Sequence, residues 1–394
     1  MGGLLAICDI HEGINFGFRV DPETGISERS LDLHRNFART AEYAIENRVD
    51  LFVVGGDLFD RTHVSPSFRE LVRKDVIEPL GRAGIKTWVL AGNHDQPRQW
   101  SRGTSLDDLR GYPHVKVFRE PTVKEAVIDG KTVTFLILPY LHPEHIADRV
   151  RERLGDEVPR EQTFELGRRM LKEWMRRRAE EAKGEHILML GHYYVEGAKV
   201  RSTAYPEVLP GEFSFTLDMI PSAVELAIFG HIHLHQVLGD RVVYVGAPER
   251  VDWGERGDPK GFVTYSPGEG WSFHPLPTRP MVKVEVDATG GDPTGQVLEA
   301  LQHGLRDALV RLEIHLEEGQ RELLDEAVIA ERLSEAFHYE ISLSYTDRER
   351  ISLEEFTLDP LRLFEEYVKL NYEDHTRLED ILREGEAILR EVLS

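Results

Sequence analysis

Cysteine is almost absent from this sequence. Cys8 is the single thiol in 394 residues, so no internal disulfide bond can form. Chains without disulfide bonds suit a reducing compartment. The first residues, MGGLLAICDI, also lack the basic segment that begins a secretory signal peptide. We therefore expect a cytoplasmic protein.

Long hydrophobic runs are absent as well. No apolar stretch approaches the roughly 18 residues that a membrane-spanning helix needs, and we expect the protein to be soluble. Side-chain amides are few, with 5 asparagines and 7 glutamines against 30% charged residues. Few amides and many charges are typical of thermophilic proteins.

The sequence has no excess of positive charge and no ATP-binding loop. Its formal net charge is -22, whereas general nucleic-acid-binding proteins are usually basic, although an acidic average permits a local basic groove. The segment IDGKTV at 128–133 resembles the end of a phosphate-binding loop, but Glu125 stands where the first glycine of that loop should be. Asp129 and Gly130 instead predict the turn of a β-hairpin.

What the sequence does contain is a regular alternation of strands and helices over residues 4–250. Apolar strands are predicted at 4–9, 51–56 and 86–92, with helices at 29–46 and 65–80 between them. Further strands are predicted at 132–140, 186–191, 224–230 and 241–246. This alternation predicts an α/β fold in which layered sheets carry helices on their outer faces.

The composition changes at PLPTRP, residues 275–280. Beyond it we predict a small α+β module, with strands at 281–287, 309–317 and 339–345 and helices at 293–306 and 321–337. The segment 353–394 is predicted to be helical, because its apolar residues recur with helical spacing. We expect domains at 1–275, 281–350 and 353–394.

Polar residues follow five of the predicted strands, and four of these five ends have a glycine beside the polar group. Glycine permits a sharp turn and a close approach of another group. The polar residues are Asp9 and His11, Asp57 and Asp60, Asn93, His94 and Asp95, His192, and finally His231 and His233.

This set of side chains predicts a metal centre. Residues two apart in an extended segment point the same way, so Asp9 and His11 can face one point, and likewise His231 and His233. Ligands of α/β sheets bind beyond the carboxyl ends of the strands. Carboxylate, imidazole and amide groups suit Mn, Fe or Zn, and seven of them fit two ions about 3.5–4 Å apart with a bridging carboxylate. Any one motif alone has an ordinary explanation, such as a turn, a helix cap or a satisfied core pair.

Together the five motifs resemble those of the calcineurin-like metallophosphoesterase superfamily, whose pattern is D-x-H, G-D-x-x-D/H, G-N-H-D/E, G-H and G-H-x-H. The segments GGDLFDRTHVSPS, LAGNHDQP and YVGAPERVDWGERGDPKGF resemble its SbcD subfamily. The likeness covers about residues 4–265. It implies a layered metallophosphoesterase core, a capping domain and C-terminal helices that dock on a partner.

The resemblance also implies roles for individual residues. Asp57 is expected to bridge two manganese ions, with Mg, Fe or Zn as other candidates. One ion is expected on Asp9, His11 and His233, and the other on Asn93, His192 and His231. His94 is the expected catalytic proton donor or electrostatic stabiliser, oriented by Asp95.

Other residues near these motifs have less certain roles. Asp60 stands where some relatives have a histidine that helps to rotate the phosphate, and His63 is a weak substitute for it. Three basic residues after a strand are expected to contact phosphate groups: Arg250, Arg256 and Lys260. His142 and His145 are expected to begin a helix rather than to bind metal.

The function implied by the resemblance is that of a DNA exonuclease and endonuclease subunit in double-strand-break repair. Its expected partners are DNA, a second copy of the chain and an SMC-like coiled-coil ATPase of the SbcC type. One alternative is a metallophosphoesterase acting on small phosphodiesters or on phosphoproteins, although GNHD replaces the G-N-H-E of phosphoprotein phosphatases. Another is a mainly structural repair-complex subunit, which the intact ligand set argues against.

Overall fold

The computed structural model describes residues 2–98, 102–155, 158–201, 213–317, 319–345, 364, 368 and 378–392. The chain divides into two compact units. The larger unit contains residues 1–282 with 304–310 and 335–338, and the smaller contains 283–303, 311–334 and the chain from 339 onward. Of the helices in the described ranges, none combines the length and the hydropathy that a bilayer crossing requires.

The first sheet of the larger unit has the strand order β12-β11-β1-β2-β3-β4. Strands β1 to β4 are parallel, and β11 and β12 extend the sheet with antiparallel pairing. The bounds are β1 (Leu4–Ile7), β2 (Leu51–Val54), β3 (Lys86–Leu90), β4 (Val115–Phe118), β11 (Gly261–Ser266) and β12 (Gly270–Pro275).

The second sheet has the order β5-β6-β7-β8-β10-β9, with antiparallel strands at both edges. The bounds are β5 (Thr122–Ile128), β6 (Lys131–Leu138), β7 (His186–His192), β8 (Leu226–Gly230), β9 (Gln236–Leu238) and β10 (Val242–Tyr244). Between β5 and β6 the chain turns at Asp129 and Gly130, whose φ angles are 48° and 74°. The Asp-Gly dipeptide tolerates these angles, so the predicted hairpin is confirmed.

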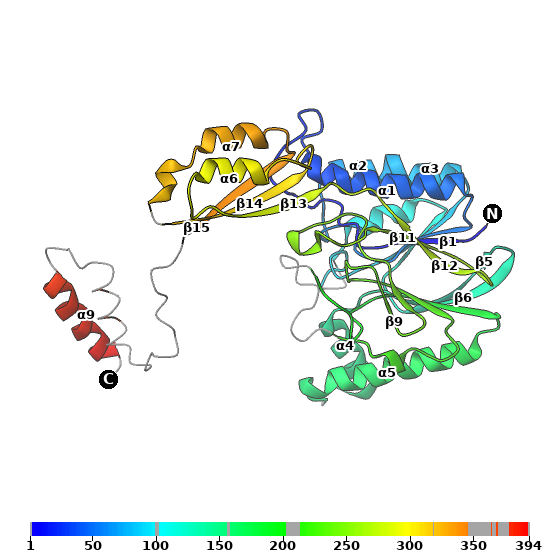
Figure 1. The fold of residues 1–394 in the computed structure, drawn as a ribbon. Helices are drawn as coiled ribbons and strands as arrows, with labels where there is room; N and C mark the ends of the chain where they lie inside the picture. Colours follow the sequence, from blue (N-terminus) through cyan, green and yellow to red (C-terminus); the bar gives the residue numbers. More distant parts are fainter. Residues whose placement is uncertain are drawn as a thin grey trace. The chain divides into compact units, whose positions relative to one another are not determined.

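Successive side chains along a strand point to opposite faces of the sheet, and the two faces pack into different hydrophobic cores. Leu5 and Ile7 of β1 pack in the helix-side core, whereas Leu4 and Ala6 face the second sheet. The covering helices are α1 (Glu28–Glu46), α2 (Pro66–Val72) and α3 (Glu78–Arg82) on the first sheet, and α4 (Pro143–Leu154) and α5 (Arg160–Glu181) on the second. Figure 1 shows the two helix layers on opposite outer faces. The predicted layered α/β fold is confirmed.

A three-stranded sheet of order β13-β14-β15 follows in the chain, with α6 and α7 on one face (Figure 1). Its elements are β13 (Met281–Asp287), α6 (Pro293–Ala300), β14 (Leu309–Leu316), α7 (Glu326–Leu333) and β15 (His338–Tyr345). Both helices are shorter than predicted. Gly304 has a φ of 77°, which a helix does not accommodate, and the Asp325 side chain caps α7 by accepting from the Ala327 and Val328 amides.

The predicted helical tail is described only in part. Helix α9 (Leu378–Val392) belongs to it, whereas most of 353–377 lies outside the described residues. Its Ile388 side chain is 62% exposed.

Candidate metal centre

The carboxyl ends of β1, β2, β3, β7 and β8 carry all the strand-end motifs found in the sequence. At these ends the backbone of several non-glycine residues is left-handed. The φ angles are 54° at Asp9, 53° at His11, 49° at Asp57 and 92° at His231. Such conformations cost about 1–3 kcal/mol each and persist where the surrounding structure enforces them, often at functional sites.

Two glycines let the strand ends approach one another. A Cβ atom at Gly92 would lie 2.1 Å from Oδ1 of Asp57, and one at Gly56 would lie 2.0 Å from Nδ1 of His192. Gly56 also has a φ of 110°. No other residue fits these two positions without moving Asp57 or His192.

Asp9, His11 and His233 form a first buried group whose ligand atoms lie within 4.8 Å of one another. Nε2 of His11 is 3.1 Å from Nε2 of His233. Burial lowers the pKa of His11, which favours the neutral imidazole that a metal ion requires.

Asp9 supplies the test of whether a cation fits here. Its carboxylate is fully buried. Oδ1 accepts the His231 amide at 2.8 Å, whereas Oδ2 has no hydrogen-bond partner in the described structure. An unpaired buried carboxylate oxygen is costly unless a cation lies beside it, so the donor set fits a metal ion.

Asn93, His192 and His231 form a second group. Oδ1 of Asn93 is 3.1 Å from Nε2 of His192 and 2.9 Å from Nδ1 of His231. His231 and His233 therefore lie in different groups, as the family resemblance implied, although their spacing allowed both to face one point. The two-residue spacing does not decide the direction of these side chains, because the backbone at Asp9, His11 and His231 is left-handed and not extended.

Asp57 lies between the two groups. Its Oδ2 is 3.1 Å from Nε2 of His192 and 3.9 Å from Nε2 of His11. Burial disfavours the charge on Asp57, but His192 and the other nearby histidines outweigh it and hold the pKa of Asp57 well below its usual value. Asp57 likewise raises the pKa of His192 against the effect of burial. A metal ion bound at His192 would take the place of that proton.

Backbone and side-chain acceptors fix the direction of two imidazole rings. Nδ1 of His192 donates to the carbonyl of Gly55 at 2.9 Å. Nδ1 of His233 donates to Oε1 of Glu255 at 2.8 Å. Both contacts place a proton on Nδ1 and direct Nε2 toward the centre, as in other metal-binding histidines.

His94 is half-buried beside these groups. Its ring makes an edge contact with His11 at a centroid distance of 4.7 Å, and its Nδ1 donates to the carbonyl of Asp60 at 2.7 Å. His94 also lines a cleft of about 750 Å³. Because Nδ1 contacts the Asp60 carbonyl, Nε2 is the nitrogen through which His94 would reach a group bound in the cleft.

Asp95 does not orient His94 as expected. Its carboxylate accepts from the backbone amides of Leu58, Phe59 and Gly92 at 2.9–3.1 Å. These contacts join the segment after β2 to the end of β3. Burial and the neighbouring Asp57 raise the pKa of Asp95 to about 7, against the effect of the three amides.

Asp60 lies close to the first group, with Oδ1 3.5 Å from Nδ1 of His11 and Oδ2 3.0 Å from Arg61. The exposed His63 lines the cleft. His142 precedes α4, and both His142 and His145 donate to backbone carbonyls, those of Gln96 and Arg98. They hold the segment after His94, which agrees with the helix-start interpretation.

The expected phosphate contacts need correction. The Lys260 side chain is buried, and its ammonium contacts Glu255 and the carbonyl of His233. The half-buried Arg250 donates to the carbonyls of Arg279 and Asp258. Lys260 is therefore not available to a phosphate, and Arg250 donates to carbonyls of the protein itself. Arg256 is exposed, and for it the expectation stays open.

Sequence reasoning missed the basic residues that do line the cleft. They are Arg61, Arg98 and Arg102, each exposed, and each a few residues after a strand-end motif. It also missed Glu255, which contacts His233 from 22 positions further along the chain. The position of the arginines after GDLFD and GNHD was the available signal, whereas nothing local marked Glu255.

A metal-dependent phosphoesterase is the class of enzyme that such a fold and site define. The family model described as Calcineurin-like phosphoesterase matches residues 4–235, and the chain belongs to this family. Family membership and the Asp/His groups together indicate divalent-metal binding.

Three curated relatives illustrate the similarity. DNA double-strand break repair protein Mre11 from Sulfurisphaera tokodaii is 26% identical, over 62% of this chain and 54% of the relative. Its counterpart from Aeropyrum pernix is 23% identical over 82% and 72%. A subunit of the nuclease SbcCD from Bacillus subtilis is 24% identical over 57% and 58%. The chain thus spans little more than half the length of two of these relatives.

Proposed function

We propose that this protein is a DNA nuclease subunit of a double-strand-break repair complex, and that it cleaves phosphodiester bonds with two manganese ions. The observation that carries the proposal is the position of Asp57. One of its oxygens lies 3.1 Å from His192 in one group of ligand atoms and 3.9 Å from His11 in the other. A carboxylate shared in this way is what a two-metal phosphoesterase requires.

The proposed centre uses the residues as the family pattern assigns them. Asp9, His11 and His233 would hold one ion, Asn93, His192 and His231 the other, and Asp57 both. The ions, when bound, lower the pKa of a water molecule and neutralise charge on the phosphoryl oxygens. In its protonated form, Nε2 of His94 would donate to the leaving or a non-bridging oxygen, with the Asp60 carbonyl fixing the ring.

A nucleic-acid substrate is supported by three exposed arginines in the cleft, whose lining also includes Asp60 and Glu144. Arg61, Arg98 and Arg102 line it beside His94, although the chain as a whole carries a net charge of -22. Arginine side chains at a nuclease site can bind the phosphates on either side of the scissile bond. Relatives whose names state DNA repair and nuclease activity also support this substrate.

The remaining parts of the chain have proposed roles in the complex. We assign residues 1–275 to the nuclease domain, 281–350 to a capping domain and 353–394 to docking of an SMC-like ATPase. Helix α9 supports docking, because Ile388 on its apolar stripe is exposed. Association with a second copy of the chain and a cytoplasmic location complete the proposal.

The test is incubation of the purified protein with Mn²⁺ and labelled duplex, hairpin and single-stranded DNA, beside a small chromogenic phosphodiester. We expect cleavage of DNA ends and of single strands, and none after chelation. Hydrolysis of the chromogenic ester without cleavage of any DNA would favour an enzyme for small phosphodiesters. Absence of both activities in protein that holds two ions would favour a structural subunit.

A further inference from the structure

A buried carboxylate stands behind one of the expected metal ligands. Glu255 is 0% exposed and lies in the segment between β10 and β11. Its Oε1 accepts from Nδ1 of His233 at 2.8 Å. Because a carboxylate can only accept, Nδ1 carries the proton and Nε2 keeps its lone pair, and this Nε2 lies 3.1 Å from Nε2 of His11.

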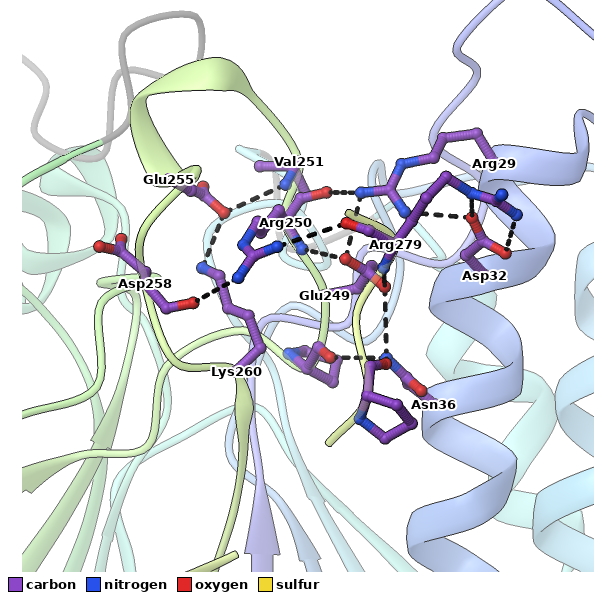
Figure 2. Close-up of polar contacts among 12 residues, drawn as sticks. Arg29, Asp32, Asn36, Glu249, Arg250, Val251, Glu255, Asp258, Lys260 and Arg279 are labelled. Atoms are coloured by element: carbon purple, nitrogen blue, oxygen red, sulfur yellow. Dashed lines mark hydrogen bonds and ion pairs between the residues drawn. The ribbon is translucent and has the colours of Figure 1, made fainter. Parts of the chain in front are cut away.

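The second oxygen of Glu255 is held as firmly as the first. Oε2 accepts from Nζ of Lys260 at 2.7 Å and from the Val251 amide at 3.1 Å. Nζ of Lys260 also donates to the carbonyl of His233 at 2.9 Å. Lys260 therefore contacts the backbone of His233 directly. It is also linked to the imidazole ring of His233 through Glu255. Figure 2 shows Glu255 and Lys260 facing each other.

A second buried carboxylate of the same segment acts elsewhere. Glu249 accepts from Arg29 of α1 at 3.2 Å and from the Arg279 amide at 3.3 Å. Arg29 also donates to the carbonyl of Arg250, and Asn36 donates to that of Pro248. These contacts, drawn in Figure 2, fasten the segment to α1. No contact joins Glu249 to His233 among the described residues, so the two carboxylates have separable functions.

We propose that Glu255 and Lys260 are positioning residues for metal binding, because they fix the tautomer and the direction of His233. The inference depends on the proposed metal centre and names residues that the ligand pattern does not include. A carboxylate behind a metal-binding histidine orients the ring and makes it a better ligand. Lys260 prevents the carboxylate from rotating away, since it holds the oxygen that His233 does not use.

The experiment is calorimetric titration of metal-stripped protein with Mn²⁺, in the wild type and in Glu255→Ala, Glu255→Gln and Lys260→Met. We expect Glu255→Ala to weaken one of the two binding steps by roughly 10–100-fold and to leave the other unchanged. Glu255→Gln should weaken the same step less, because its carbonyl oxygen can still accept from Nδ1. Lys260→Met should resemble Glu255→Gln.

Glu249→Gln is the matched control, because it makes the same change in the same segment without a contact to His233. We expect it to lower thermal stability and to leave both Mn²⁺ affinities unchanged. Wild-type affinity in Glu255→Ala, or equal weakening of both steps, would overturn the inference. The proposed nuclease function fails separately, if wild-type protein that binds two Mn²⁺ ions cleaves no DNA.

Discussion

The Asp57 carboxylate at the end of β2 lies 3.1 Å from Nε2 of His192 at the end of β7. These strands belong to different sheets of the larger unit. The contact therefore joins the two sheets at the proposed metal centre. An ion that binds both residues should stabilise the folded state in which the sheets are packed together.

Replacement of Asp57 tests this link. We expect Mn²⁺ to raise the Tm of the wild type, by an amount that corresponds to about 2.7 kcal/mol at 100 times Kd. Asp57→Asn should lose the bound metal and the rise in Tm, because an amide is a weaker ligand and cannot neutralise the charge of two ions. Elemental analysis and a thermal melt measure both effects. A full metal complement in Asp57→Asn would contradict the bridging role.

His94→Ala separates metal binding from catalysis. We expect the variant to retain its metal ions but to lose cleavage of a DNA end by about 10²–10⁴-fold, the usual contribution of a general acid. His186→Ala is the control, since His186 begins β7 at the opposite end from the centre and pairs with Glu225. Normal cleavage by His94→Ala would rule out its assigned role.

The arginines of the cleft should contribute to the binding of DNA but not to the hydrolysis of small phosphodiesters. Arg98→Ala and Arg102→Ala are expected to raise KM for DNA and to leave hydrolysis of a chromogenic phosphodiester unchanged. Each lost phosphate contact should reduce the slope of log K for DNA binding against log salt concentration by about 0.9. Arg177→Ala on α5, where Arg177 pairs with Glu173, is the control. An unchanged salt dependence in both cleft variants would exclude phosphate contacts there.

His34 should make stability depend on pH. Burial lowers its pKa, but Glu12 and Asp75 outweigh burial and raise the pKa of His34 from 6.5 to about 9. Its Nδ1 is 2.8 Å from Glu12 and its Nε2 is 3.0 Å from Asp75. Because the folded pKa is the higher one, this stabilisation is complete below pH 6.5 and is lost as the pH rises through 9.

Urea unfolding of the wild type and of His34→Gln at pH 6, 7.5 and 9 measures the effect. We expect the difference between their free energies of unfolding to shrink by up to about 3 kcal/mol across this range. A difference that stays constant with pH would show that His34 is not charged in the folded protein.

Local sequence patterns predicted much of the fold and of the site. The strand ends were predictable because each motif is a short run in which an apolar strand stops and polar residues follow. Asp9, Asp57 and Asn93 could be selected because five such strand ends occur in the same chain. The hairpin at Asp129 and Gly130 was predictable because few residues tolerate its backbone angles.

Predictions that depended on distant contacts were less successful. Lys260 was expected to contact phosphate because it follows a strand and is basic, yet it is 2% exposed and paired with Glu255. The family resemblance implied that Asp95 orients His94, yet the Asp95 carboxylate accepts from the amides of Leu58, Phe59 and Gly92 instead. The cleft is lined by Arg61 and Arg98 from separate loops, and their proximity comes only from the packing of strands.

The sequence by itself determined which residue types stand at the strand ends and the family to which the chain belongs. Both follow from the order of residues along a few short segments. Only the tertiary structure decided which groups face one another, as for His11 and His233, which lie 222 positions apart and whose Nε2 atoms are 3.1 Å apart. The physical reason is that such contacts arise when whole sheets and loops pack, and no local pattern encodes their direction.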